Sequence, residues 1–345
     1  MKSQQNPVKK YLGLAIFFLL VIGVLIAFSN LSHLKQHFAS LNPVYLLLSI
    51  LSALCVYIIE GLILKEALYL FNEKIKTFLS IKYSFIINSI GYLVSLGGLT
   101  PFATQVYILD YHNINAKKST LTRILQIMLF NIVFNIMLIV GFIFLVINKA
   151  SYNYSNSIIL IPFVALIVIV SLFYFTLFWK KFRVVFTRIF TNIINKIIRI
   201  FTKKVKISPL TILDYLGEFD EGLKQLISKP SNFILMVLTI LVDWAFWMGT
   251  LYFAFLAVNY KINIEFLVVG FAVGQIIGVI SMVPGGAGTL EASMSLAFKA
   301  FGIPFETSIA AVLIYRCTFY IFPFLLSMPL YFSLKKKLEP ATRKK

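Results

Sequence analysis

The sequence predicts an all-α, polytopic integral membrane protein with about six full spans and two re-entrant helical hairpins in an inverted-repeat arrangement. Of its 345 residues, 59% are hydrophobic and only 13% are charged, whereas soluble domains carry about 25% charged residues. The mean hydropathy is +0.89. Apolar runs of about 20 residues, the length that crosses a bilayer, recur along the chain, and two further runs are interrupted by glycine and proline.

The uninterrupted apolar runs give the full spans of a single integral membrane domain covering residues 1–345. The first run follows a basic tail and has no small-residue cleavage site after it, so we interpret it as a retained helix rather than a signal peptide. The predicted spans are 11–29, 43–64, 121–147, 157–179, 232–258 and 306–333.

Lysine and arginine predict the orientation of these spans, because basic loops remain in the cytoplasm. Both terminal tails are basic, and the loops at 30–42, 148–156 and 259–263 carry little charge. We therefore expect a multi-pass membrane protein with cytoplasmic N- and C-termini. The net charge of +19 indicates contact with an anionic membrane surface, and we expect no nucleic-acid partner.

The two interrupted runs, 83–109 and 264–303, are predicted to be broken hairpins. Region 83–109 has basic segments on both sides and must enter from and return to the cytoplasm. Region 264–303 lies between an outgoing and an incoming span, so it must enter from and return to the outside. Broken helices that meet from opposite faces are typical of inverted-repeat transporters. The alternative is two kinked full spans.

The segment 180–230 between the fourth and fifth spans is predicted to be cytoplasmic and interfacial. Residues 180–206 carry nine lysine and arginine side chains and no acid, with apolar residues at near-helical spacing. This pattern favours an amphipathic helix lying in the inner interface. A short helix between Ser208 and Pro230, with the acidic cluster of the chain, is expected to follow.

The break at Ser281–Ser293 is the strongest functional signal. Irregular backbone at membrane depth survives only where it is buried in protein or lines a wet cavity, and an acidic side chain there indicates a functional site. A helix beginning after Gly288 directs its free N–H groups and partial positive charge at the break, which favours anion binding. We predict ligand binding by Pro284, Gly285, Gly286, Gly288 and Glu291. Alternatively, Glu291 only neutralises Arg316.

Arg316 and Asp243 lie near the middle of predicted spans, and we predict that both bind the ligand. Arg316 should face the bundle interior, where its fork suits a carboxylate or a phosphate, and its expected protein partner is Glu291 or Asp243. Glu60 lies nearer the inner end of its span, and we expect it to be interfacial. In the first hairpin the predicted ligand-binding residues are Gly97, Gly98, Thr100 and Gln105.

The sequence lacks the common motifs of disulfide frameworks, metal sites and enzyme active sites. Cys55 and Cys317 make no disulfide or metal framework, and the three histidines show no zinc spacing. The sequence has no phosphate-binding loop, no zinc-protease motif and no serine-hydrolase motif. We therefore predict no metal, no cofactor and no catalytic residue.

The two C-terminal motifs resemble a known family. Ser281-x-x-Pro284-Gly-Gly-x-Gly288-x-x-Glu291-Ala292, followed by Tyr315-Arg316-x-x-x-Tyr320-x-x-Pro323-Phe324, is similar to the transmembrane (flippase) region of lysylphosphatidylglycerol synthases, the membrane domain of the multiple peptide resistance factor. The resemblance covers essentially the whole chain. It implies a cavity that carries lipids between leaflets, and it adds Tyr315 and Tyr320 to the predicted ligand-binding residues.

The resemblance also sets the functional alternatives. The first is a flippase or transporter for anionic or aminoacylated phospholipid, or for another lipid phosphate. The second is an enzyme, either a phosphatidylglycerol lysyltransferase or a membrane subunit of a lipid-modifying or glycosyltransferase system. Because the family's soluble transferase domain is absent from this sequence, lysine transfer would require a separate soluble transferase as partner. The third is a membrane scaffold whose buried charges are structural. The sequence leaves the oligomeric state open.

Overall fold

A computed structural model describes residues 37–94, 99–147, 229–281 and 283–342, with isolated positions between 181 and 195. Every regular element in these ranges is helical, which confirms the all-α fold class for this part of the chain. Several predicted features lie outside the described residues. These are the spans 11–29 and 157–179, the glycines Gly97 and Gly98, and nearly all of segment 180–230.

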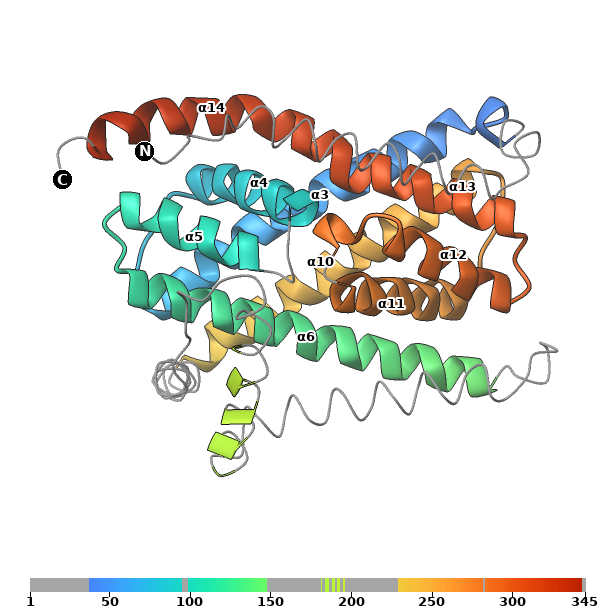
Figure 1. Ribbon diagram of the computed structural model, residues 1–345, viewed down its shortest axis with the longest axis horizontal. Helices are drawn as coiled ribbons and strands as arrows, with labels where there is room; N and C mark the ends of the chain where they lie inside the picture. The colour runs from blue at the N-terminus through green and yellow to red at the C-terminus, as the bar shows by residue number, and fades with distance from the viewer. Residues whose placement is uncertain are drawn as a thin grey trace.

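Within the described ranges, four helices are long and apolar enough to cross a membrane. They are α3 (Pro43–Leu70), α6 (Ala116–Ile147), α10 (Pro230–Ala257) and the continuous stretch Phe305–Leu334. They correspond to four of the six predicted spans, so the chain is a multi-pass membrane protein. Figure 1 shows α6 and the last stretch running along the long axis on opposite sides of the bundle.

The starts of α3 and α10 follow from local chemistry. Each begins with a proline, at Pro43 and Pro230, and proline is tolerated at the first helical position because no N–H is needed there. The Asn42 side chain accepts a hydrogen bond from the backbone N–H of Val44 at 3.1 Å, which caps α3.

The last span is one path built from three pieces. Helix α13 (Phe305–Arg316) continues through a π-helical turn, η3 (Cys317–Ile321), into α14 (Phe322–Thr342). Pro323 has no N–H to offer the carbonyl four residues earlier, which belongs to Phe319. The hydroxyl of Tyr57 donates to that carbonyl at 3.0 Å. A side chain from α3 therefore satisfies the acceptor that the proline leaves unused.

Each interrupted run forms a pair of helices that pack against each other. The first pair is α4 (Thr77–Val94) and α5 (Leu99–Tyr111), and the second is α11 (Ile264–Ile280) and α12 (Thr289–Ala300). Helix α4 begins at Thr77, ahead of the predicted residue 83. Helices α5 and α12 have 13 and 12 residues. At 1.5 Å per residue each extends roughly 20 Å, which is less than the ~30 Å hydrocarbon core.

The two helix pairs occupy opposite ends of the long axis in Figure 1, with α4 and α5 at the left and α11 and α12 at the right. The short helical turn η2 (Pro284–Gly286), which leads from α11 towards α12, packs against α4. The second pair therefore touches the first at its turn.

The second helix pair is held together by close backbone approach. Gly270, Gly274 and Gly278 repeat every fourth residue on the face of α11 that meets α12. A Cβ at Gly270 would lie 2.2 Å from a ring carbon of Phe298, and one at Gly274 would lie 2.8 Å from Met294. Small residues at this spacing let membrane helices pack tightly.

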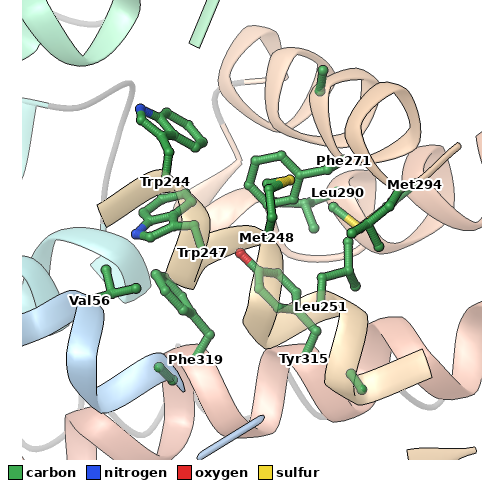
Figure 2. Packing of buried hydrophobic residues seen from close by; sticks show 14 of the residues in the cluster. Val56, Trp244, Trp247, Met248, Leu251, Phe271, Leu290, Met294, Tyr315 and Phe319 are labelled. Atoms are coloured by element: carbon green, nitrogen blue, oxygen red, sulfur yellow. The ribbon is translucent and has the colours of Figure 1, made fainter. Parts of the chain in front are cut away.

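Helix α10 lies at the centre of the largest buried cluster, between α3, α11 and the last span (Figure 2). The Trp247 ring lies 4.6 Å from Phe319 and 5.8 Å from Phe271, measured between ring centroids. These edge-to-face contacts connect three separate helical elements through one side chain.

The packing of α11 on α12 gives a stability prediction. Gly270→Ala forces Phe298, which is fully buried, out of its place, and overpacking of this kind costs about 1–3 kcal/mol. We expect a lower apparent melting temperature in detergent, followed by tryptophan fluorescence. Gly278→Ala is the matched control and should lower the melting temperature less, because its new Cβ would lie 3.3 Å from its nearest neighbour instead of 2.2 Å. Equal melting temperatures for the two variants would contradict this packing.

Candidate functional site

The glycine turn between α11 and α12 depends on residues without a Cβ. Gly285, Gly286 and Gly288 have φ values of 63°, 62° and 80°, a region that side chains disfavour. At Gly286 a Cβ would also lie 3.3 Å from the Cα of Gly278. Pro284 opens this turn. The three glycines therefore reverse the chain through backbone conformations that larger residues disfavour, and at Gly286 the space is also narrow.

Glu291 joins the turn to the start of α12. Its Oε2 accepts a hydrogen bond from the backbone N–H of Gly288 at 2.7 Å, so the carboxylate caps the helix that begins there. The negative charge also lies in the first turn of α12, where the helix dipole favours it. The residue is 1% exposed, and its second oxygen is used by a different element.

The second carboxylate oxygen of Glu291 binds Arg316 of the last span. The Nε of Arg316 donates to Oε1 of Glu291 at 2.6 Å, and its Nη2 donates to the carbonyl of Gly285 at 2.8 Å. The guanidinium also lies 4.3 Å from the ring centroid of Tyr320. Of the two partners predicted for Arg316, the structure selects Glu291. The last span is thereby fastened to the glycine turn by a buried ion pair.

Asp243 lies elsewhere, in the middle of α10. It is fully buried, and within the described part of the chain neither of its carboxylate oxygens has a hydrogen-bond partner. Its electrostatic neighbours include Glu60 on α3 and Tyr92 on α4. Because these neighbours lie on α3 and α4, the carboxyl group of Asp243 lies near the first helix pair and is not part of the Arg316–Glu291 pair.

Glu60 is not interfacial, as the sequence suggested, but buried. Its Oε2 accepts from Nδ2 of Asn88 at 2.5 Å, and its Oε1 accepts from the hydroxyl of Tyr92. The same amide nitrogen of Asn88 donates to Ser84 Oγ at 3.1 Å. The interfacial prediction was wrong because α4 packs over α3 and covers the carboxylate with polar side chains.

A cavity of about 200 Å³ lies beside Glu60, between α3, α4, α5, α6 and α10. Arg123 of α6 reaches it, and its Nη1 donates to Oε1 of Gln105 at 3.5 Å. Gln105, a predicted site residue, therefore lines the cavity. The polar lining residues are Glu60, Ser84, Asn88, Tyr92, Gln105, Arg123, Gln126 and Asn131.

The other predicted residue of the first hairpin that the structure describes, Thr100, has a different position. It lies at the start of α5, and its carbonyl accepts a hydrogen bond from Thr104 Oγ1 at 2.8 Å. It is not among the residues that line the cavity.

Aromatic rings join the cavity to the glycine turn. The hydroxyl of Tyr92 donates to Glu60, and the Tyr92 ring lies 5.8 Å from the Tyr320 ring. The guanidinium of Arg316 in turn lies over the Tyr320 ring. Tyr315 stacks on Phe319 at 5.5 Å and meets Tyr320 edge-on at 5.8 Å. Tyr315 and Tyr320, both predicted site residues, are therefore buried in the layer between the two polar centres.

A family model described as the lysylphosphatidylglycerol synthase TM region matches residues 11–327. This chain belongs to that family. A phosphatidylglycerol lysyltransferase of Staphylococcus haemolyticus (strain JCSC1435) is 24% identical over 337 residues, which cover 95% of this chain and 34% of that relative. A protein of the same name from Staphylococcus aureus (strain COL) is 26% identical over 102 residues, 29% of this chain and 12% of that relative. The chain thus spans about a third of the length of the first relative.

In this member of the lysylphosphatidylglycerol synthase TM family, sequence reasoning missed Glu60 and Arg123 as cavity residues. Both lie inside apolar helices but close to basic flanks, Lys65 in one case and Lys117 and Lys118 in the other. A charge so near a flank usually reaches the interface. For Arg123 the available signal was Gln126, a polar residue one turn away on the same helix face.

The ion pair of the glycine turn gives the second prediction. Glu291→Gln or Arg316→Gln leaves one buried charge without its partner, which costs about 3–5 kcal/mol. We expect each single variant to lower the apparent melting temperature strongly. The double variant Glu291→Gln with Arg316→Gln should recover part of that loss, because no unpaired charge remains. Additive losses in the double variant would show that the two side chains act independently.

Proposed function

We propose that the protein binds an anionic or aminoacylated phospholipid of the lysylphosphatidylglycerol type, or another lipid phosphate, and moves its headgroup across the bilayer. The observation that carries this proposal is the polar cavity with Glu60 and Arg123 on its wall, inside a bundle of membrane-spanning helices. Ionisable groups within a membrane bundle mark substrate or ion pathways. Membership in the lysylphosphatidylglycerol synthase TM family supports a lipid as the substrate.

The proposed arrangement is an inverted repeat in which α4–α5 enters from the cytoplasm and α11–α12 from the outside. Two observations support it. The arms α5 and α12 are shorter than a full span, and the turn η2 packs against α4. Broken helices that meet near the midplane form the substrate site of many transporters, and movement of one repeat against the other opens it to alternate faces.

Within this arrangement the glycine turn serves as the outer gate. The turn Pro284–Gly288 and the Glu291–Arg316 pair close the second hairpin, and Tyr315 and Tyr320 lie between it and the cavity. Gln105 and Thr100, with Gly97 and Gly98 outside the described residues, belong to the first hairpin. Asp243 is proposed to receive a substrate amine or a coupling proton, because a buried carboxyl without a hydrogen bond is costly and ionisable residues within membrane spans mark substrate and proton pathways.

We place the protein in the bacterial cytoplasmic membrane with both termini in the cytoplasm. The basic tails and the basic segment 180–206 support this orientation. They also support contact with an anionic membrane surface.

The printed name of the relatives makes lysine transfer to phosphatidylglycerol a second candidate. Lysyl transfer from lysyl-tRNA to phosphatidylglycerol by the purified chain would establish it. We expect instead that the chain translocates lipid but does not transfer lysine, and that a separate soluble transferase supplies the aminoacylated lipid.

Translocation by proteoliposomes is the third prediction. We expect the chain to speed the passage of fluorescent phosphatidylglycerol or lysylphosphatidylglycerol from the inner to the outer leaflet, detected by dithionite quenching. Asp243→Asn removes the ionisable group without changing its size, and we expect a rate at least about tenfold lower, equivalent to about 1.4 kcal/mol.

The matched control is Asp110→Asn, the same change on α5 at an exposed position, which should translocate at the wild-type rate. Both variants must show the wild-type melting temperature. A wild-type chain that does not exceed empty liposomes would refute the proposed function, and an unchanged rate in Asp243→Asn would remove Asp243 from it.

A further inference from the structure

The cavity beside Glu60 is lined by an arginine, Arg123, that forms no contact ion pair with a described residue. Among the described residues, Arg123 makes no salt bridge of 4 Å or less, in contrast to Lys118 with Glu73 and Arg316 with Glu291. Arg123 lies about two turns into α6 and borders the cavity. Although the residue as a whole is only half-buried, its Nε is buried, and a buried guanidinium group requires an anionic or strongly polar partner.

Two hydrogen-bond donors at the cavity wall have no acceptor among the described residues. They are Nε of Arg123 and Nε2 of Gln105, and Gln105 is only 1% exposed. A buried donor without a partner costs about 1–3 kcal/mol. Both groups lie on the same cavity, and the 3.5 Å hydrogen bond between Arg123 and Gln105 holds them side by side. Adjacent donors of this kind suit an oxyanion.

The neighbouring carboxylate does not supply that oxyanion. Both oxygens of Glu60 already accept hydrogen bonds, from Tyr92 and Asn88. Glu60 and Arg123 interact through space, which lowers the cost of burying the guanidinium and leaves its donors available. Asp243 is near Glu60 and Tyr92 but does not line the cavity.

The size and position of the cavity limit what can enter. A volume of about 200 Å³ is smaller than the usual 300–1,000 Å³ of a site that encloses a whole small ligand. It fits a headgroup fragment and not the acyl chains. One wall includes Ile127, an apolar side chain that is 37% exposed on α6. The acyl chains could therefore remain in the bilayer beside α6.

We propose that this cavity is the phosphate-binding site for the lipid, with Arg123 donating to the phosphodiester oxygens and Gln105 donating beside it. The inference rests on the proposed function and specifies where the phosphate binds. Arg316 of the last span is fully buried, but Glu291 and the Gly285 carbonyl already hold it. The phosphate is therefore recognised at the first hairpin, while the second hairpin is closed by its own ion pair.

A binding experiment on the purified full chain in detergent tests this site. Trp244 and Trp247 line the cavity, so their fluorescence reports occupancy. The probes are short-chain phosphatidylglycerol, diacylglycerol with the same acyl chains, and inorganic phosphate. We expect saturable binding of phosphatidylglycerol and none of diacylglycerol. Loss of the charged donor in Arg123→Gln should weaken binding roughly 10- to 100-fold.

Further variants keep the test independent of folding. Arg123→Lys retains the charge without the fork and should bind with intermediate affinity, and Gln105→Leu should lose less affinity than Arg123→Gln. Lys117→Gln is the matched control, because it removes the same charge from an exposed position on the same helix, and it should bind as the wild type does. Each variant must elute as a monodisperse peak with the wild-type melting temperature.

The outcomes separate this inference from the proposed function. Wild-type affinity in Arg123→Gln, or equal binding of diacylglycerol, would overturn the phosphate site even if the chain translocates lipid. Binding of inorganic phosphate but not of phosphatidylglycerol would overturn the lipid as its source. Binding that depends on Arg123 in a chain that moves no lipid would support the site and refute translocation.

Discussion

The buried ion pair between Arg316 and Glu291 is the interaction on which the second half of the bundle depends. A guanidinium and a carboxylate in an apolar interior are stable only when both are paired and their remaining hydrogen-bonding groups are used. Here Glu291 also caps α12 through Gly288, and Arg316 also holds the carbonyl of Gly285. One pair thereby fixes the glycine turn, the start of α12 and the position of the last span.

The shape of the last span follows from a second constraint, the missing N–H of Pro323. The Phe319 carbonyl that this proline cannot bond is taken by the hydroxyl of Tyr57, and the chain passes through the π-helical turn just before it. This turn holds Phe319 and Tyr320 against Tyr92 of the first hairpin. The two helix pairs are thus connected through aromatic rings of the last span.

The two polar centres use similar residues for different purposes. Around the glycine turn, the charges of Arg316 and Glu291 neutralise each other, which favours a closing element. Beside α4, the carboxylate of Glu60 is satisfied by neutral donors, and Arg123 keeps donors directed at a cavity. The difference lies in whether the opposite charges are within contact distance, and it is the reason that we propose a closing role for the first centre and a binding role for the second.

The amino-acid sequence by itself determined the membrane class, the four described spans, the two interrupted runs and the interior position of Arg316, Glu291 and Asp243. Each follows from hydropathy, from glycine and proline, or from the cost of charge at membrane depth, all of which act locally along the chain. Only the tertiary structure decided that Arg316 pairs with Glu291 and not with Asp243. It also decided that Glu60 is buried and that Arg123 lies beside Gln105. These depend on which helix faces meet, and contacts between residues far apart in the sequence, such as Tyr57 with Phe319 at a separation of 262 positions, are not encoded in any local pattern.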